Sequence, residues 1–245
     1  MPAECHLYTD LAHLFRLLTP PEDYVEEAAF WREVLRGRLG PGRHQILELG
    51  VGGGHNLSHL TADFDATAVD LSEAMLEQCR RLNPGVELLV GDMRSVRLQR
   101  VFDAVLIHDA IGSMTTQADL TAAFVTAATH LRPGGVFITS PDFFLEDFRE
   151  PAVDTATHSE GETSLTYFEY VWDPDPSDTS VEAVLTYLIR DRAGLRIEHD
   201  RLVMGLFPKA IWIHLMTDVG FHVSEQTFPH SSGRPYTLLV GQAPD

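Results

Sequence analysis

The chain has 245 residues, which is enough for one domain of ordinary size or for one domain with an insertion. Its formal net charge is −18 and Lys209 is its single lysine, so nucleic acids and anionic membranes are not expected as partners, because binding either needs clustered cationic side chains. No apolar run is long enough to cross a bilayer, and no basic segment precedes an apolar core at the N-terminus, which predicts a cytoplasmic location.

Cysteine and histidine spacing gives no sign of a metal centre. Cys5 and Cys79 do not form a CxxC pair, and neither has a histidine at the spacing of a metal ligand. We therefore expect two reduced cysteines and no structural metal.

The first forty residues are expected to be helical, and strands alternate with helices after them. Apolar residues at three- and four-residue spacing predict helices within residues 8–40, with Gly37 and the turn at 40–42 as the stop. The strands that follow are short and apolar and cover residues 44–50, 65–71, 86–92, 102–109 and 134–142. The helices between them cover residues 55–64, 72–82 and 117–130. This alternation predicts a parallel, doubly wound α/β sheet.

The pattern changes after residue 144. Residues 163–173, 180–191 and 195–207 alternate in the manner of strands, which predicts an inserted antiparallel meander. A helix over 208–220 and strands over 221–228 and 236–243 are expected to complete the sheet. The expected parts are an N-terminal helical cap (1–42), an α/β core (43–144), an antiparallel insertion that serves substrate or a dimer (145–207) and C-terminal elements of the core (208–245).

The strongest motif is a glycine-rich turn directly after the first expected strand. It reads Glu48-Leu-Gly50-Val-Gly52-Gly53-Gly54. Glycines allow a tight turn and let a ligand approach the backbone, and the helix that follows presents free N–H groups. By itself the motif also fits a dinucleotide enzyme, or a turn that only packs the fold.

Acidic residues end the next two strands at the same edge of the sheet. Asp70 ends the second strand, where a carboxylate can accept hydrogen bonds from both hydroxyls of a ribose. Asp92 ends the third, where it can accept from an adenine amino group while the N–H of Met93 donates to the ring. Each acidic residue also fits a solvated strand end or a helix cap. Ligands of open α/β sheets bind at this carboxyl edge, so the set indicates a nucleoside-containing ligand.

These motifs, followed by LRPGG at 131–135, resemble those of the class I S-adenosylmethionine (SAM) methyltransferases, most specifically over residues 46–142. The resemblance implies a Rossmann-like sheet, SAM as the cofactor and S-adenosylhomocysteine (SAH) as the product. The cofactor contacts that it implies are Glu48, Gly50 and Gly52 at the methionine moiety, Asp70 at the ribose, and Asp92 and Met93 at the adenine. Leu71 and Met75 are two further cofactor candidates, with a core position as the alternative for Met75.

A closer resemblance is to the N,N-dimethyltransferases that act on nucleotide-linked deoxyaminosugars. The residues that carry it are Tyr8, Asp23-Tyr24, GDMRSVRL at 91–98, the meander and Ser232-Gly233-Arg234. In that family an N-terminal helical lid closes over the cofactor, which implies that Tyr8 and Tyr24 lie near its methionine end. Arg234 is expected to hold a substrate diphosphate. Ordinary half-buried tyrosines and a solvated turn arginine are the alternatives.

Two residues after the fourth expected strand bear on the mechanism. A neutral amine needs only to lose its proton before methyl transfer, whereas a hydroxyl needs a general base. His108 is a candidate for that base, and Asp109 for a partner that orients it. A direct bond between the two is not expected, because neighbours on an extended segment point to opposite faces. Alternatively, the His108 carbonyl accepts from the SAM amino group while the ring packs over the cofactor.

Phe144 and Trp172 are candidates for substrate contact, because aromatic residues of the later segment can roof a pocket. We expect a SAM-dependent methyltransferase that acts on an amine or hydroxyl of a small molecule in secondary metabolism. The alternatives are a peptide or protein N-methyltransferase and a SAM- or SAH-binding protein without transferase activity. An NAD-dependent dehydrogenase fits the glycine spacing less well. A homodimer is left open.

Overall fold

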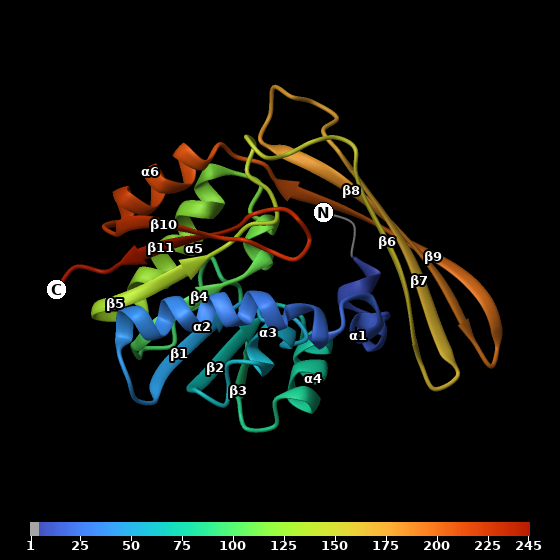
Figure 1. The fold of residues 1–245 in the computed structure, drawn as a ribbon, viewed down its shortest axis with the longest axis horizontal. Coiled ribbons are helices and arrows are strands. Elements are labelled where there is room, and N and C mark those ends of the chain that lie inside the picture. The colour runs from blue at the N-terminus through green and yellow to red at the C-terminus, as the bar shows by residue number, and fades with distance from the viewer. Residues whose placement is uncertain (1–4) are drawn as a thin grey trace.

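The computed structural model describes residues 5–245 and contains two separate β-sheets (Figure 1). The seven-stranded sheet has the order β10 (His222–Phe228), β11 (Tyr236–Gln242), β5 (Leu131–Thr139), β4 (Phe102–Ile107), β1 (His44–Leu49), β2 (Phe64–Asp70) and β3 (Glu87–Val90). The four-stranded antiparallel sheet has the order β6 (Ala152–Glu160), β7 (Thr163–Trp172), β8 (Ser180–Asp191) and β9 (Gly194–Gly205). The predicted α/β fold with an antiparallel segment is confirmed.

Helices cover both faces of the seven-stranded sheet (Figure 1). One layer contains α2 (Val25–Leu39), α3 (His55–Ser58) and α4 (Glu73–Leu82), and the other contains α5 (Gln117–Thr129) and α6 (Lys209–Val219). In the central strand β4, Val105 and Ile107 pack toward α5 and α6, whereas Ala104 and Leu106 pack toward the first layer. A strand covered on both faces has to be apolar at successive positions, which explains the sequence FDAVLI.

Helix ends follow the local signals with one exception. Ser72 caps α4, because its Oγ accepts a hydrogen bond from the N–H of Met75 at 3.2 Å. Gly220 ends α6 in the left-handed conformation. Gly37, expected to stop the preceding helix, lies inside α2, which continues to Leu39 and ends at Gly40. An exposed glycine weakens a helix without ending it.

The four-stranded sheet packs one face against the N-terminal segment. This segment consists of η1 (His6–Tyr8), η2 (Ala12–Leu14), α1 (Phe15–Leu18) and η3 (Pro21–Tyr24). Leucines along it share a core with the inner face of the sheet, including Leu165, Val181 and Tyr187. The first helix expected within residues 8–40 is therefore replaced by short helical turns. The leucines of this segment pack against the four-stranded sheet and do not line one face of a single helix.

Two other elements differ from expectation. The helix predicted over 55–64 is limited to α3, after which turns bring Leu60 into the core and lead directly into β2. Strand β6 was not predicted, because its mostly exposed sequence AVDTATHSE lacks apolar alternation. Pairing with β7 along its whole length makes it a strand. Within residues 5–245, no helix has the length and apolar character needed to span a membrane.

Candidate cofactor and substrate site

The glycine-rich turn lies at the carboxyl edge of β1, where two of its residues have to be glycine. Gly50 has φ of +75°, and a Cβ there would lie 2.5 Å from the Cβ of Ala110 and 2.7 Å from Met93 Cε. Gly54 has φ of +73°, and a Cβ there would lie 2.5 Å from Cys79 Sγ. Side chains at these positions would be both strained and crowded. The turn is therefore fixed closely by its neighbours at this edge of the sheet.

Asp70 holds this turn from the end of β2. One carboxylate oxygen accepts from the N–H of Gly52 at 2.7 Å, and the other accepts from the N–H of Ser72 at 2.8 Å. Burial raises the pKa of Asp70, and these backbone hydrogen bonds partly offset that effect. Each oxygen keeps a lone pair, so Asp70 can still accept from two ligand hydroxyls.

Glu48 is a buried carboxyl group that lacks a full set of partners. It is 2% exposed at the end of β1, and its Oε2 has no hydrogen-bond partner among residues 5–245. Burial raises the pKa of Glu48 to about 8, although the nearby His108 acts in the opposite direction. A buried acceptor without a donor is costly, and a cationic ligand group would satisfy it. The ammonium group of a SAM methionine moiety has that chemistry, so the site fits the cofactor.

The remaining cofactor candidates surround the turn in different ways. Met93 reaches Gly50, whereas Asp92 is bound by Arg94, with 2.7 Å between Asp92 Oδ2 and Arg94 Nη2. This guanidinium lowers the pKa of Asp92. Asp92 is therefore not the free acceptor that the sequence suggested, and an adenine amino group would have to share it with Arg94.

Two candidates near Asp70 have opposite environments. Leu71 is 70% exposed, at the rim of the edge, where it is free to contact a ligand. Met75 is 1% exposed, and its Cε lies 3.5 Å from the position of a Cβ on Gly52. Met75 thus supports the glycine turn from below, which agrees with the core alternative.

His108 follows β4 and lies in a buried polar network. Its Nε2 is 2.8 Å from Glu27 Oε2 and 3.0 Å from the hydroxyl of Tyr236, which also accepts from the indole N–H of Trp31 at 2.8 Å. Its Nδ1 is 3.3 Å from Asp109 Oδ1. The two side chains are therefore within ion-pair distance, a contact that the sequence did not predict. The strand ends at residue 107 and η4 (Asp109–Ser113) begins at once, so the alternation of an extended segment does not apply.

This network favours the protonated form of His108. Burial by itself lowers the pKa of His108, but the Tyr236 oxygen and the carboxylates of Asp109 and Glu27 more than offset it and hold the pKa well above its usual range. The charged His108 in turn lowers the pKa of Asp109, against the effect of burial. An imidazolium between two carboxylates has no free lone pair, so the geometry argues against the predicted role of general base.

The N-terminal segment places two tyrosines beside this network. The Tyr24 ring centroid is 5.7 Å from that of His108 and 6.0 Å from that of His55, which follows the glycine turn. The backbone carbonyl of Tyr8 accepts from Ser72 Oγ at 2.5 Å, so the segment crosses the edge next to Asp70. The structure therefore brings Tyr8 and Tyr24 to the same edge as the glycine turn.

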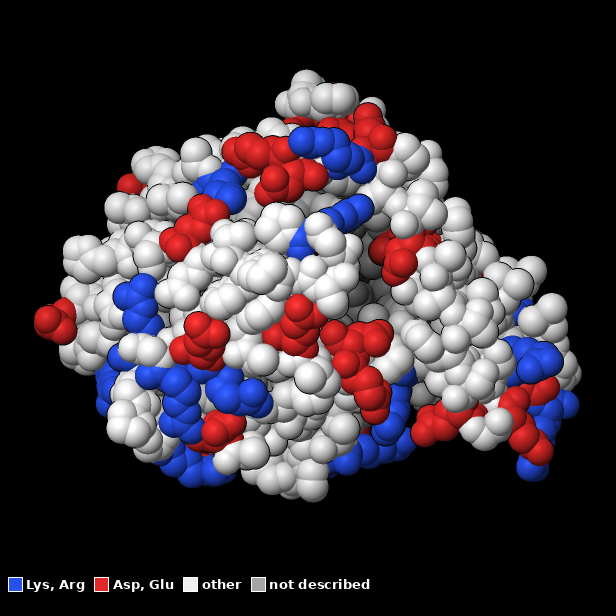
Figure 2. Space-filling view, viewed as in Figure 1, with Lys and Arg blue, Asp and Glu red and all other residues white. Residues whose placement is uncertain are grey.

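A hollow separates the α/β body from the four-stranded sheet, with acidic side chains around its opening (Figure 2). Asp142, after β5, and Glu169, on β7, carry carboxyl groups with raised pKa values, chiefly through burial. Asp109 and Glu169 are among the charges that act on Asp142. Sequence reasoning missed both residues, and for Asp142 the available signal was its place just beyond a central strand.

The substrate candidates of the sequence lie elsewhere. Phe144 is 4% exposed and packs in the α/β core, 6.0 Å from Trp212 between ring centroids, so it is a packing residue. Trp172 lies beside Tyr170 on the outer face of the four-stranded sheet, because Val171 between them faces the core. These positions favour packing for Phe144 and an outer-face location for Trp172, and substrate contact by either residue stays a prediction.

Arg234 lies in the turn between β10 and β11. The turn is tied to α2, since the N–H of Ser231 donates to both Glu26 oxygens at 3.1 Å. The side chain of Arg234 is exposed. It therefore stays a candidate for a ligand that extends out of the hollow.

Known proteins that are similar to this chain are methyltransferases, in agreement with the geometry of the site. A family described as a methyltransferase domain matches residues 46–135. The crystal structure of Streptomyces venezuelae DesVI is 29% identical, with a TM-score of 0.82 over 97% of this chain and 98% of that one. Residues 46–135 therefore contain a methyltransferase domain, and the chain as a whole has the fold of DesVI. The predicted fold is confirmed, and these similarities support the predicted methyltransferase family and SAM as its cofactor.

Two further similarities concern particular members of the class I methyltransferases. The chain is 37% identical over 145 residues to the dTDP-3-amino-3,4,6-trideoxy-α-D-glucopyranose N,N-dimethyltransferase of Streptomyces venezuelae. That alignment spans 58% of this chain and 60% of the relative, which is less than two thirds of its length. A SAM-bound structure of CalS10, an amino pentose methyltransferase from Micromonospora echinaspora, is 26% identical with a TM-score of 0.76, over 89% of this chain and 91% of that one.

Proposed function

We propose that the protein transfers a methyl group from SAM to the amine of a small molecule, and that nucleotide-linked amino sugars are its substrate class. The names of the similar proteins support this class, since they specify a dTDP-linked amino sugar and an amino pentose. An antibiotic or other secondary-metabolite pathway is the corresponding setting.

The observation that carries the proposal is the buried His108 held between the carboxylates of Glu27 and Asp109. A hydroxyl acceptor needs a strong base, and the imidazolium held by Glu27 and Asp109 cannot supply one. An amine is attracted as a cation by Asp109, Asp142 and Glu169, and needs only to lose a proton. The acceptor that best suits this electrostatic environment is therefore an amine.

The cofactor roles inferred from the sequence stay part of the proposal. SAM supplies the methyl group on a sulfonium centre, and the protein aligns it and keeps water away. The residues assigned to SAM are Glu48, Gly50 and Gly52 at the methionine moiety, Asp70 at the ribose, Asp92, Met93 and Leu71 around the adenine, and Tyr8 and Tyr24 above. His108 closes the site from β4, and Arg234 is proposed to meet a substrate diphosphate.

Other aspects of the protein stay predictions from the sequence. They are a cytoplasmic location, the absence of nucleic-acid and membrane partners, and a homodimer.

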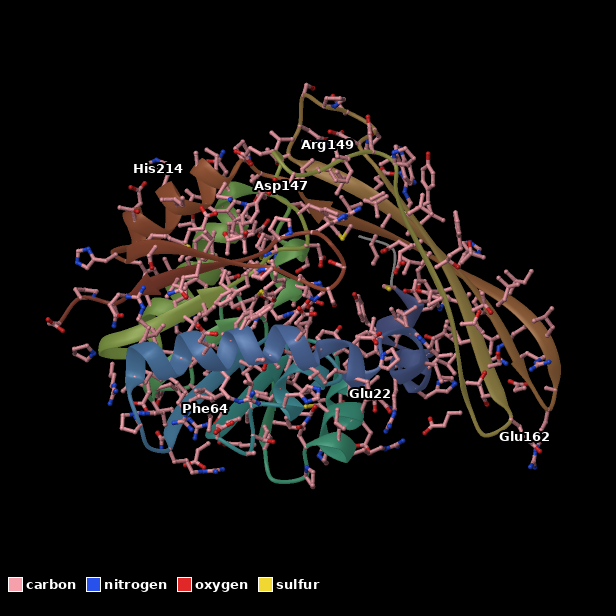
Figure 3. All side chains as sticks on the ribbon, in the orientation of Figure 1. Glu22, Phe64, Asp147, Arg149, Glu162 and His214 are labelled. Carbon is pink, nitrogen blue, oxygen red and sulfur yellow. The ribbon has the colours of Figure 1, made fainter. Side chains whose placement is uncertain are left out.

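Thermal unfolding with SAH, and then with dTDP added, tests the proposal. Ligand at about one hundred times its dissociation constant stabilises the folded state by roughly 2.7 kcal/mol, which is a shift of several degrees. Asp70→Ala is expected to abolish the SAH shift. Asp65→Ala is the matched control, because Asp65 is exposed and follows Phe64, the first residue of the same strand (Figure 3).

Turnover completes this test. Purified protein with SAM and dTDP-3-amino-3,6-dideoxy-α-D-glucopyranose is expected to give mono- and dimethylated product by mass spectrometry. An SAH shift without transfer to any dTDP-linked amino sugar would rule out the proposed substrate class. No SAH shift at saturation would rule out the cofactor site itself.

A further inference from the structure

We propose that Asp142 is the catalytic residue that takes the proton from the substrate ammonium group before methyl transfer. This inference rests on the proposed function and adds the proton acceptor that an amine substrate requires. It concerns a residue that neither the glycine turn nor the lid contains.

The first argument is the position of Asp142 on the sheet. It follows β5 by three residues, and β5 pairs in parallel with β4, whose end carries His108. Asp142 Oδ2 is 3.8 Å from the position of a Cβ on Gly112, in η4. The carboxylate therefore lies over the carboxyl ends of the two central strands, next to the pair His108 and Asp109. Substrates of open α/β sheets are bound at this place.

The second argument is that the Asp142 carboxylate is free to react. Among residues 5–245 it takes part in no ion pair within 4.0 Å and accepts no side-chain or loop hydrogen bond, and the residue is exposed to solvent. The charged groups that act on it come from every element around the hollow. They are His108 and Asp109 after β4, Glu27 on α2 and Glu169 on β7.

The N-terminal segment completes the enclosure of Asp142. The carboxylates of Asp109 and Asp142 both raise the pKa of the Tyr8 hydroxyl, behind the larger effect of burial and that of Cys5. Tyr8 therefore lies near both carboxylates, at the sheet edge where its backbone carbonyl accepts from Ser72. A substrate amine in the hollow would be in reach of Asp142 while the lid limits the access of water.

An independent observation indicates that a cationic group binds at this edge of the sheet. Glu48 ends β1, the strand beside β4, and is paired in register with Leu106, two residues before His108. Its buried Oε2 has no partner, and Asp109 is among the charges that raise its pKa. Glu48 thus provides, at the end of the strand next to β4, an unsatisfied buried acceptor that a cationic cofactor group would satisfy.

Neither other ionisable group at the centre can accept this proton. His108 has both ring nitrogens directed at acceptors, and Asp109 is stabilised as an anion by His108, which lowers its pKa. Asp142 differs, because the protein atoms packed around its carboxylate reduce its hydration, although the residue keeps access to solvent, and the charge on Asp109 adds to that effect. Together they raise the pKa of Asp142 to about 8. A base with a pKa near the working pH is the most effective kind.

The step balances as an acid–base transfer followed by substitution. The N–H bond of the substrate ammonium breaks and its proton passes to the Asp142 carboxylate, which leaves a lone pair on the nitrogen. This lone pair attacks the methyl carbon of SAM, and the C–S bond breaks with its electrons on sulfur, which yields SAH. The product leaves as a methylated ammonium ion, and Asp142 returns its proton to solvent.

The test compares Asp142→Asn with Asp147→Asn, an exposed aspartate on the same segment between β5 and β6 (Figure 3). The probe substrate is dTDP-3-amino-3,6-dideoxy-α-D-glucopyranose, and the readouts are the SAH dissociation constant and the pH profile of kcat/KM. For the wild type and Asp147→Asn, kcat/KM is expected to rise with pH and level off near the pKa of Asp142. Asp142→Asn is expected to lose about 100-fold in kcat at neutral pH, to lose this limb of the profile and to keep its SAH affinity.

A second variant tests the same base from another element. Removal of the charge by Glu169→Gln is expected to lower the pKa of Asp142 and to move the rising limb to lower pH. His108→Asn is expected to keep the rise of kcat/KM with pH, although its turnover falls. The inference would be overturned if Asp142→Asn kept kcat within about twofold of wild type, or if it lost SAH binding. Absence of turnover by the wild type would instead refute the proposed function, and this inference with it.

Discussion

The seven-stranded sheet is covered by helices on both faces, whereas the four-stranded sheet is packed on one face and exposed on the other. The first has parallel central strands, whose carboxyl ends meet at one edge and hold the glycine turn, Asp70 and His108. The second consists of long antiparallel strands and supports the N-terminal segment. One sheet builds the floor of the site, and the other holds its lid.

This difference separates two kinds of stabilisation. Side chains on the central strands lie in a closely packed core, where the loss of even one methylene group lowers the free energy of unfolding. Outer side chains of the four-stranded sheet, such as Ile197 at 64% exposure, bury little surface in this chain. The inner face of the second sheet holds the N-terminal segment through a shared apolar core and through polar contacts such as those of Asp200. The experiments below test this division.

The largest expected effect compares two phenylalanines on strands. Phe137 on β5 is 0% exposed, and Phe168 on β7 is 44% exposed. Phe137→Ala is expected to lower the free energy of unfolding by about 3–5 kcal/mol, because it opens a cavity in the core. Phe168→Ala is expected to change it by less than about 1 kcal/mol. Urea denaturation measures both.

If Phe168→Ala were as destabilising as Phe137→Ala, the proposed difference in stabilisation between the two sheets would be wrong. A loss that depended on protein concentration would point to a second copy of the chain covering the outer face, which is the homodimer left open by the sequence.

The lid contact is expected to have an intermediate effect. The Asp200 carboxylate, 4% exposed, accepts from the N–H groups of His6 and Leu7 at 2.8 and 2.9 Å and from the Tyr187 hydroxyl at 3.3 Å. Asp200→Ala removes a charged acceptor from three donors, so we expect a loss of about 1–3 kcal/mol in stability and roughly tenfold in SAH affinity. Calorimetric titration with SAH measures the latter.

The neighbour of Asp200 provides the control for this prediction. His199 is exposed on the outer face of the same strand, and His199→Ala is expected to leave both quantities unchanged. Equal SAH affinity in Asp200→Ala and wild type would mean that the lid does not need the four-stranded sheet.

The smallest expected effect is a pH dependence at the floor of the site. The free protein holds Glu48 with a pKa raised to about 8, so the carboxyl group is mostly protonated at neutral pH. A cationic ligand group needs the anion, so SAH affinity should rise with pH up to about 8, by at most about tenfold per pH unit. By the same linkage, the free protein loses stability as pH rises from the ordinary pKa of a glutamate to about 8, because folding then has to keep the group protonated.

Glu48→Gln is the matched variant for this pH dependence. It cannot ionise, so its SAH affinity is expected to be weaker and constant over the same range. Calorimetric titration with SAH at several pH values measures the affinity of both proteins and tests this prediction. A wild-type affinity that does not change with pH would show that no cation meets Glu48.

The sequence by itself determined the features that depend on neighbouring residues. Three such features lie close together in the sequence. They are the glycine turn after an apolar strand, Asp70 at the end of the next strand and Ser72 as a helix cap. Because parallel strands present their carboxyl ends at one edge, these local signals also predict where the proposed cofactor site lies. Fold class, family and cofactor followed from that short stretch.

The tertiary structure alone decided which distant groups meet. His108 contacts Glu27 and Tyr236, which are 81 and 128 positions away, and no spacing rule connects them. Those partners turn an expected base into an imidazolium. The exposed Asp142 and the buried Glu48 likewise acquire their raised pKa values from groups that are distant in the sequence. Burial and long-range charge set a pKa, and both arise only when the chain has folded.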